Sequence, residues 1–344
     1  NIDSVAGVSL KVNRRTGADL LRAVVRYLLS YGMVDQEFIN AKTTGFKKFA
    51  DRLNQLDAAL IADIPWVKPA RLIDFIHQYV RAKKPVIIVD GGTIIPAEMS
   101  LLNDLTLMTG NVGRDGSGII VLRTPGNAQG LLDMGVSPNY LPGHEPLNPG
   151  NRKTLAEKWG VKIPARKGKN SLEILEGIER GEIQGLVVVG QEALGEIGNG
   201  IFGVPLFSVL LSTEVPHNAP YPHIALPAAT FAESEGTYTN CERRGQHLQQ
   251  ALKPPTGKSN WEIIAELSNA LGYAMNYRSA AEIFEEINEV VPIYRDVKED
   301  GSFDAGKQWR YSRNGGFDVE GGLARFKLPD QKENAGIEIL GLLR

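Results

Sequence analysis

The chain has 344 residues, and at about 150 residues per domain this length predicts two domains. Hydrophobic residues make up 42% and charged residues 23% of the chain, a balance that excludes disorder as its main state. The 38 Lys and Arg residues are balanced by 40 Asp and Glu residues, which leaves a net charge of -2 and no basic excess for binding nucleic acid.

The cysteine count and the apolar runs exclude further classes of protein. Cys241 is the only cysteine, so this chain alone cannot build a disulfide framework, a thiolate zinc site or a cysteine-held iron-sulfur cluster. The longest apolar runs have the length of a strand and fall far short of the ~20 residues that span a bilayer. The chain begins with Asn1 and lacks a signal-peptide pattern, as expected of a processed protein or of an excerpt from a longer one.

Helices alternate with short apolar strands along the chain. Apolar residues recur at helical spacing over residues 16–32, 70–82, 97–109, 172–180, 260–272 and 280–289. Short apolar runs predict strands over residues 85–89, 185–189, 205–211 and 224–227. Thr16 and Asp19 resemble a capping box at the first helix, and the run 85–89 is typical of a strand buried on both faces. This alternation predicts an α/β fold with mostly parallel sheets and helices on both faces.

Two of these strands are followed by glycine turns. Gly91 and Gly92 come directly after the strand 85–89, and Gly190 and Gln191 come after the strand 185–189. Ligands of parallel α/β sheets bind beyond the carboxyl ends of the strands. The two turns are therefore the places where the sequence predicts a bound ligand.

Several familiar motifs are rejected by their context. The glycine-rich stretch 110–118 follows a helix, so a helix-ending loop is favoured over a dinucleotide loop. The stretch 254–259 ends like a phosphate loop, but it lacks the first glycine and a preceding strand. His217 and His223 have no motif of metal ligands around them and are interpreted as loop histidines with ordinary hydrogen bonds.

Two passages are more informative than these motifs. In residues 122–143, Arg123 ends an apolar stretch and is followed by glycines and amides, an arrangement that suits binding of anionic oxygens. The residues alone somewhat favour the alternative, a surface loop with a solvated Arg123. In residues 226–246, the polar alternation after Gly236 indicates an exposed strand, and the alternative is a charged hairpin edge that blocks aggregation.

These two passages, in this order and separation, resemble the molybdopterin oxidoreductase family, especially the catalytic subunit of formate dehydrogenase. The similar segments are residues 31–39, 108–135, 226–244 and 261–273. The resemblance implies two mostly parallel three-layer α/β units, as in the central domains of formate dehydrogenase and DMSO reductase-type proteins. Residues 1–123 would be the second half of one dinucleotide-binding-like domain, residues 124–291 a second α/β domain, and residues 292–344 an irregular C-terminal extension.

The resemblance also implies a cofactor and its contacts. The complete protein would hold molybdenum or tungsten bis(molybdopterin guanine dinucleotide), with an iron-sulfur cluster outside this chain and no metal ligand within it. Arg123 matches the arginine that steadies a small anionic substrate such as formate. Asn127, Gln129 and Gly130 match the amide and glycine pattern that faces the pterin. The residues expected to line the cofactor grooves are Gly91, Gly92, Gly190, Gln191, Ser212, Thr213 and His217.

Departures from the family pattern leave the function open. Pro125 stands where the family has glutamine, and after Gly190 the family's turn is replaced by Gln191 and two residues that do not match. An alternative is therefore a cofactor-free structural domain, as in the large iron-sulfur subunit of an NADH:quinone oxidoreductase-type complex. A free-standing interaction domain that binds neither metal nor nucleotide also remains open.

The resemblance further implies what would surround the chain. The expected partners are the missing N- and C-terminal domains of the same protein, iron-sulfur electron-transfer subunits and the small anionic substrate, with no nucleic acid. The expected location is the cytoplasm, with attachment to a membrane complex only through partners. The chain alone is expected to be inactive, because it has no thiolate ligand in the matching place.

Overall fold

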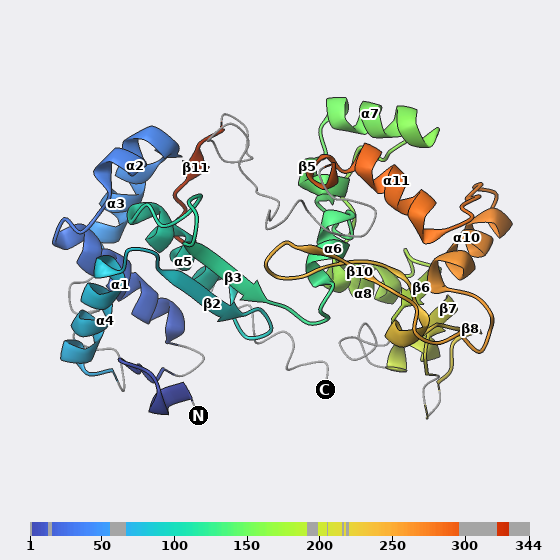
Figure 1. Ribbon diagram of the computed structural model, residues 1–344, viewed down its shortest axis with the longest axis horizontal. Coiled ribbons are helices and arrows are strands. Elements are labelled where there is room, and N and C mark those ends of the chain that lie inside the picture. The colour runs from blue at the N-terminus through green and yellow to red at the C-terminus, as the bar shows by residue number, and fades with distance from the viewer. Residues whose placement is uncertain are drawn as a thin grey trace. The chain divides into compact units, whose positions relative to one another are not determined.

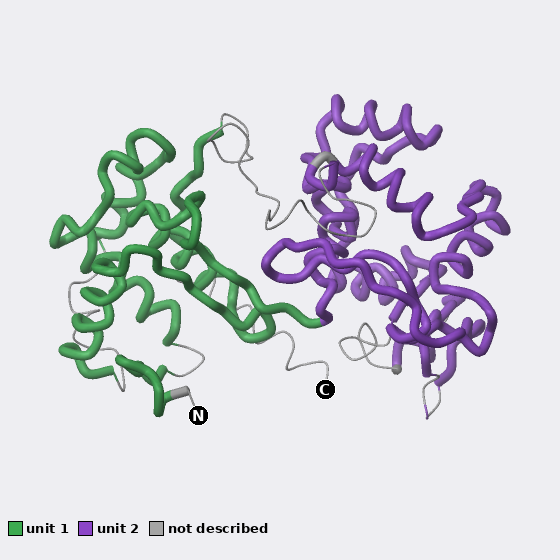
Figure 2. The backbone as a smooth tube through the Cα atoms, viewed as in Figure 1, with its two compact units in different colours: residues 1–124, 310–344 green, residues 125–309 purple. Residues whose placement is uncertain are grey.

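The computed structural model describes residues 2–12, 16–55, 67–190, 199–204, 206–214, 217, 220–295 and 322–329. The chain divides into two compact units, as Figure 2 shows: unit 1 contains residues 1–124 and 310–344, and unit 2 contains residues 125–309. The boundary between Thr124 and Pro125 lies just after Arg123. The described C-terminal segment 322–329 belongs to unit 1, so the chain returns to the unit in which it begins.

Unit 1 is a parallel strand pair with helices around it (Figure 1). Its elements are η1 (Ile2–Ser4), α1 (Gly17–Ser30), α2 (Gln36–Lys42), β1 (Thr43–Thr44), α3 (Phe46–Asn54), α4 (Pro69–Arg81), β2 (Val86–Asp90), α5 (Pro96–Met108), β3 (Gly118–Leu122) and β11 (Ala324–Arg325). Strands β2 and β3 run parallel, with Val86 opposite Gly118 and Asp90 opposite Leu122. The short strand β11 adds the C-terminal segment in parallel to β1.

The core of unit 1 forms where α1 packs against α5. Val24 and Leu28 of α1, together with Leu101 and Leu105 of α5, are almost completely buried. Pro96 occupies the first turn of α5, because that position needs no backbone N–H donor. Burial of these apolar side chains is the main stabilising contribution to the unit.

The start of α1 differs from the predicted capping box. Thr16 is the N-cap, but its side chain makes no capping hydrogen bond with the described part of the helix. The Asp19 carboxylate instead accepts a hydrogen bond from Nη1 of Arg22 at 2.8 Å. Arg22 is almost completely buried, and a buried charge without a partner is strongly destabilising. The Asp19 carboxylate supplies that partner.

Unit 2 contains a three-stranded parallel sheet and an antiparallel hairpin (Figure 1). Its elements are α6 (Ala128–Asp133), β4 (Tyr140–Leu141), η3 (Pro142–His144), β5 (Glu145–Pro146), α7 (Pro149–Trp159), α8 (Ser171–Glu179), β6 (Gly185–Val189), η4 (Asn199–Gly203), β7 (Phe207–Ser212), β8 (Ile224–Pro227), η5 (Phe231–Glu233), β9 (Gly236–Thr239), β10 (Gly245–Leu248), α10 (Asn260–Ala270), α11 (Ala280–Val290) and η6 (Pro292–Tyr294). The sheet has the order β6-β7-β8, and Leu211 pairs with both Val189 and Leu226. Strands β9 and β10 form the hairpin.

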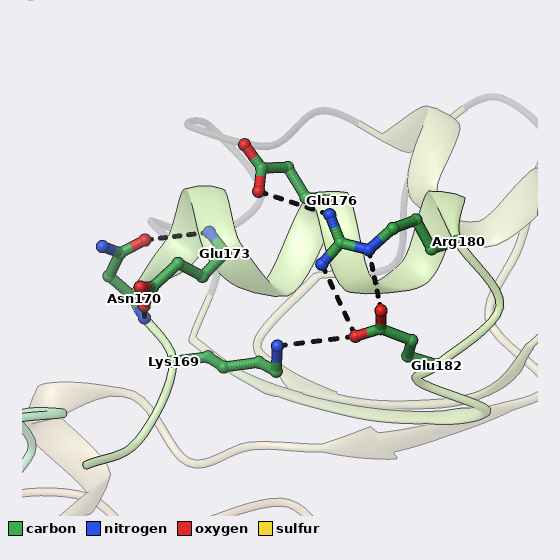
Figure 3. Close-up of polar contacts among 6 residues, drawn as sticks. All are labelled: Lys169, Asn170, Glu173, Glu176, Arg180 and Glu182. Carbon is green, nitrogen blue, oxygen red and sulfur yellow. Dashed lines mark hydrogen bonds and ion pairs between the residues drawn. The ribbon is translucent and has the colours of Figure 1, made fainter.

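Helix α8 is fixed at both ends by local polar contacts (Figure 3). At its start, the Asn170 side chain accepts the backbone N–H of Glu173 at 2.9 Å, while the Glu173 carboxylate accepts the backbone N–H of Asn170 at 2.8 Å. This capping contact is the main reason that the pKa of Glu173 lies below its ordinary value. At the other end, Arg180 pairs with Glu182 at 2.8 Å and with Glu176 at 3.6 Å. Residues in and beside this helix therefore determine where it begins and ends.

The parallel pairings confirm the predicted α/β fold, but the predicted burial of the strand 85–89 on both faces is wrong. Side chains of β2 alternate between exposed and half-buried, and Ile88 is 63% exposed. Val187 and Val189 of β6 are also exposed. In the described part of the chain, only one face of each of these strands is covered, and an apolar run does not reveal which neighbours cover it.

No helix within the described ranges is long and apolar enough to cross a membrane.

Candidate functional site

Gly91 and Arg123 lie side by side at the carboxyl end of the strand pair in unit 1. The register pairs Asp90 with Leu122, which makes Gly91 and Arg123 the next residues on the two strands. The backbone N–H of Gly91 donates to the carbonyl oxygen of Leu122 at 2.7 Å. A Cβ at position 91 would lie 2.7 Å from that oxygen and 3.2 Å from Cγ of Arg123. The close approach of the two strands therefore requires glycine at position 91. The Arg123 side chain is exposed.

The turn at Gly92 is closed by Asp90. The Asp90 carboxylate accepts the backbone N–H of Gly92 at 2.9 Å and the hydroxyl of Thr93 at 3.1 Å. The N–H groups of both glycines in this turn thus already have acceptors within the protein. A nucleotide tail bound here would have to contact other atoms of the turn.

The second predicted turn lies at the carboxyl edge of the sheet in unit 2. Gly190 has a φ of 92°, and its N–H donates to the Leu211 carbonyl at 2.9 Å. Ser212 is buried, and its Oγ accepts the backbone N–H of Glu214 at 3.3 Å. Thr213 and His217 are exposed. Gln191, which the sequence also predicts at this edge, lies outside the described residues.

A separate pocket of about 750 Å³ lies within unit 2. Asn127 and Gly130 line it from the start of α6, and Glu235 and His247 line it from the β9–β10 hairpin and its approach. Apolar and aromatic side chains form much of the remaining wall, namely Met134, Trp261, Ile283, Phe284, Ile287 and Tyr294. Two of the three residues predicted to face a pterin are thus brought together in a pocket of ligand size.

Asn127 and Gly130 shape the pocket through close backbone contacts. The Asn127 side-chain oxygen accepts the backbone N–H of Thr239 at 2.8 Å, which ties the start of α6 to β9. Gly130 is buried beside the same Asn127 oxygen, and a Cβ there would collide with it. The glycine and the amide therefore depend on each other, which explains their spacing in the sequence.

Gln129, the third predicted pterin residue, supports a buried carboxylate instead of lining the pocket. Oδ1 of the fully buried Asp133 accepts hydrogen bonds from Nε2 of Gln129 and from Nε2 of His144, each at 2.7 Å. Oδ2 accepts the hydroxyl of Tyr294 at 2.9 Å, and that hydroxyl also contacts Oγ1 of Thr239. The network joins α6, η3, β9 and η6 around one side of the pocket.

Trp261 was not predicted as a site residue, although it begins the family-like segment 261–273. It lines the pocket, and its Nε1 is buried without a hydrogen-bond partner among the described residues. The preceding Asn260 fixes its position, because the amide of Asn260 accepts the N–H of Ala229 at 2.7 Å and donates to the Ala229 carbonyl at 3.0 Å. Periodicity alone gives no sign of this unpartnered donor.

The other polar groups do not form a metal centre in the part of the chain that the structure describes. Within those ranges, no three His, Cys, Asp or Glu side chains gather closely enough to hold a metal ion. His223 is a loop histidine whose Nδ1 lies 3.0 Å from the Ser208 hydroxyl, as the ordinary interpretation expects. Cys241 is a free thiol of intermediate exposure.

The comparison with known families decides the identity. The model described as molybdopterin oxidoreductase matches residues 12–270 of the chain. The chain belongs to the molybdopterin oxidoreductase family. This confirms the predicted resemblance.

The relatives that this chain matches are much longer than the chain itself. Relatives from Staphylococcus aureus strains USA300 and N315 that carry the name "Putative formate dehydrogenase" are 31% identical over 300 residues. The match covers 83% of this chain but 30% of each relative, so the chain spans less than a third of their length. The solved structure of acetylene hydratase from Pelobacter acetylenicus has a TM-score of 0.67 and 14% identity, covering 98% of this chain and 51% of that one. That likeness shows the fold.

Membership in this oxidoreductase family implies a molybdenum or tungsten pterin cofactor. The unit 2 pocket fits the pterin part of such a cofactor, since its volume lies within the roughly 300–1,000 Å³ of small-molecule sites and its walls are largely apolar with a few polar groups. The glycine turns fit a nucleotide less well, because their N–H groups are already used.

Proposed function

We propose that this chain is part of a formate dehydrogenase-like molybdopterin oxidoreductase, and that it helps to hold a bis(molybdopterin guanine dinucleotide) cofactor and a small anionic substrate. The observation that carries the proposal is the unit 2 pocket, where Asn127 and Gly130 line a cavity of ligand size with largely apolar walls. When bound, the cofactor would supply two-electron redox chemistry at its metal. The residues of this chain would bind and orient it.

Arg123 is the residue proposed to hold the substrate anion. The backbone that leads to Arg123 is fixed because β3 pairs with β2. The two strands lie so close together that position 91 accommodates only glycine. The exposed guanidinium offers a planar set of donors that matches a carboxylate. The role proposed for Arg123 is to bind and orient a substrate such as formate while it is oxidised.

The proposed contacts with the dinucleotide tails lie at the two strand edges. Gly91 and Gly92 would line the groove in unit 1, and Gly190, Ser212, Thr213 and His217 that in unit 2, with Gln191 following Gly190 in the chain. Thr213 and His217 are exposed, so their side chains are accessible to a ligand. The shape of the two grooves and their side-chain donors would hold the tails, because the glycine N–H groups already have acceptors.

The rest of the proposed protein follows from the length of its relatives. Since the chain spans 30% of a relative, further domains would supply the metal ligand and complete the pterin site. Iron-sulfur centres outside this chain, in those domains or in partner subunits, would receive the electrons. The cytoplasm is the proposed location, with any membrane attachment made through partners.

The test is cofactor analysis of the full-length protein. Molybdenum and tungsten are quantified by plasma mass spectrometry, the pterin by fluorescence after oxidation, and the guanine nucleotide after acid release. The proposal expects stoichiometric metal together with pterin and guanine nucleotide. A folded full-length protein that contains none of them, although produced in a host that makes the cofactor, would contradict it.

A second candidate function is a cofactor-free structural domain in an NADH:quinone oxidoreductase-type complex. The observation that favours it is that hydrogen-bonding groups of the predicted nucleotide turns already have partners within the protein. The Asp90 carboxylate accepts the N–H of Gly92, and the Ser212 hydroxyl accepts the N–H of Glu214. Such a domain would bind iron-sulfur subunits without metal or pterin of its own. The same cofactor analysis separates the two functions, because the structural domain would be folded and assembled without cofactor.

A further inference from the structure

A row of polar residues from the β9–β10 hairpin lines one side of the unit 2 pocket. Glu235 and Thr237 line it from β9 and its approach, and His247 and Gln249 line it from β10 and the residue that follows. The register places Thr237 directly opposite His247. Glu235, His247 and Gln249 are exposed, so a ligand in the pocket can reach their side chains. The hairpin therefore presents hydrogen-bonding groups to the cavity.

The contacts of β9 show which face of the hairpin is turned toward the pocket. Thr239 lies two residues after Thr237, on the same face of the strand, and its hydroxyl contacts the hydroxyl of Tyr294, which lines the pocket. Tyr238, which alternates with them, does not line the pocket. Phe284 of α11 adds a second aromatic ring to the remaining wall. A bound ligand would meet polar groups of the hairpin and apolar surface of α11 and η6.

The Glu235 carboxylate is available to a ligand. It makes no hydrogen bond or ion pair with any residue that the structure describes. The nearby Glu233 differs, because its carboxylate already accepts the backbone N–H of Thr230 at 2.8 Å. None of the described residues that line the pocket is Lys or Arg, so the wall has no such cation to pair with Glu235. A ligand that supplies N–H donors would fill this role.

These groups indicate which kind of ring would fit. A carboxylate has two oxygens that act only as acceptors, so it matches a ligand edge with two adjacent N–H donors. The 2-amino and N3–H groups of a 2-amino-4-oxopyrimidine ring form such an edge. The side chains of His247 and Gln249 can donate to the 4-oxo group, and a flat fused ring suits the aromatic surface of Phe284 and Tyr294.

We propose that the Glu235 carboxylate accepts hydrogen bonds from the 2-amino and N3–H groups of the pterin ring, which makes Glu235 a cofactor-binding residue of this chain. The inference rests on the proposed function, because it takes the pterin to be the occupant of the pocket. Guanine carries the same 2-amino-4-oxopyrimidine edge, so the test has to compare the two rings.

The experiment measures binding of pterin, lumazine and guanosine to the full 344-residue chain by equilibrium dialysis. Lumazine has the fused ring of pterin but an oxygen in place of the 2-amino group, so it cannot make the paired contact. We expect the unsubstituted chain to bind pterin at least about 10-fold more tightly than lumazine. Glu235→Gln puts an NH₂ donor in place of one carboxylate oxygen, and it should lose most of this preference. Since the preference is a ratio measured on one variant, partial unfolding would not change it.

Glu242→Gln is the matched control. Glu242 is an exposed acid in the turn of the same hairpin, pairs with Arg244 at 3.3 Å and does not line the pocket. This variant should keep its pterin affinity within about 2-fold of the unsubstituted chain. Both variants should keep the unfolding midpoint of the unsubstituted chain, because exposed carboxylates contribute little to stability.

Three results would contradict the assignment of Glu235. An equal preference for pterin over lumazine in Glu235→Gln and in the unsubstituted chain would overturn it. An unsubstituted chain that binds pterin no better than lumazine would overturn it too. Tighter binding of guanosine than of pterin would overturn the assignment to the pterin ring. In each case the proposed function stands or falls separately, with the cofactor content of the full-length protein.

Discussion

The phenol hydroxyl of Tyr294 donates a hydrogen bond to the fully buried carboxylate of Asp133 at 2.9 Å, across 161 residues of sequence. This bond holds η6 against α6 at the wall of the pocket. Tyr294→Phe would leave Oδ2 of Asp133 without this donor, and we expect the free energy of unfolding to fall by roughly 1–3 kcal/mol. Urea unfolding followed by circular dichroism measures the change.

Tyr221→Phe is the control for this substitution. Tyr221 is 54% exposed, so loss of its hydroxyl should change the free energy of unfolding by no more than about 0.5 kcal/mol. If the two variants unfolded at the same urea concentration, the Asp133–Tyr294 bond would have no special part in stability.

Gly91→Ala should destabilise unit 1 because the new Cβ would lie 2.7 Å from the Leu122 carbonyl oxygen. Relief of this contact requires the two strands to separate, at a cost of about 1–3 kcal/mol. Gly126→Ala is the matched control, since a Cβ there meets nothing within 4 Å. Thermal unfolding of both variants measures the difference, and equally stable variants would refute the close-approach argument.

Arg123→Ala should weaken turnover of an anionic substrate in the full-length, cofactor-loaded protein. Removing one electrostatic contact to reacting oxygens typically costs about 10²–10³-fold in rate, and we expect a loss of that order in kcat/KM for formate. The exposed side chain should contribute little to folding, so the unfolding midpoint should stay the same. Arg71→Ala, an exposed arginine on α4, is the control, and an unchanged rate in Arg123→Ala would remove the proposed role.

The sequence predicted the elements of the fold better than the contacts between them. The strand 224–227 and the helix starting at Asn260 lie where the local pattern placed them, because periodicity and capping residues act over a few positions. The partnership of Asp133 with His144 and Tyr294 has no such local signal, since it depends on how α6, η3 and the distant η6 meet. Gln129 and Asp133 stand at the local helical spacing of four residues, but that spacing does not reveal that Asp133 is fully buried and needs the contact.

Asp104 is a buried acid on α5 that meets the C-terminal segment of unit 1. Its Oδ1 accepts the backbone N–H of Lys327 at 3.1 Å, and its Oδ2 has no partner among the described residues. Burial is the dominant influence and raises the pKa of Asp104 to about 7, although the hydrogen bond from Lys327 opposes the shift. The ordinary pKa of 3.8 applies when the chain is unfolded.

Between these two pKa values the folded protein binds more protons than the unfolded chain, so the free energy of unfolding should fall as the pH rises from about 4 to about 7 and then level off. The full loss could reach about 4 kcal/mol. Urea unfolding at pH 5 and pH 8 measures the larger part of this loss, and Asp104→Asn should lose most of this dependence because the asparagine stays neutral. The exposed Asp51→Asn on α3 should keep the dependence of the unsubstituted chain. A pH response that is the same in both variants would mean that Asp104 does not control the stability of unit 1.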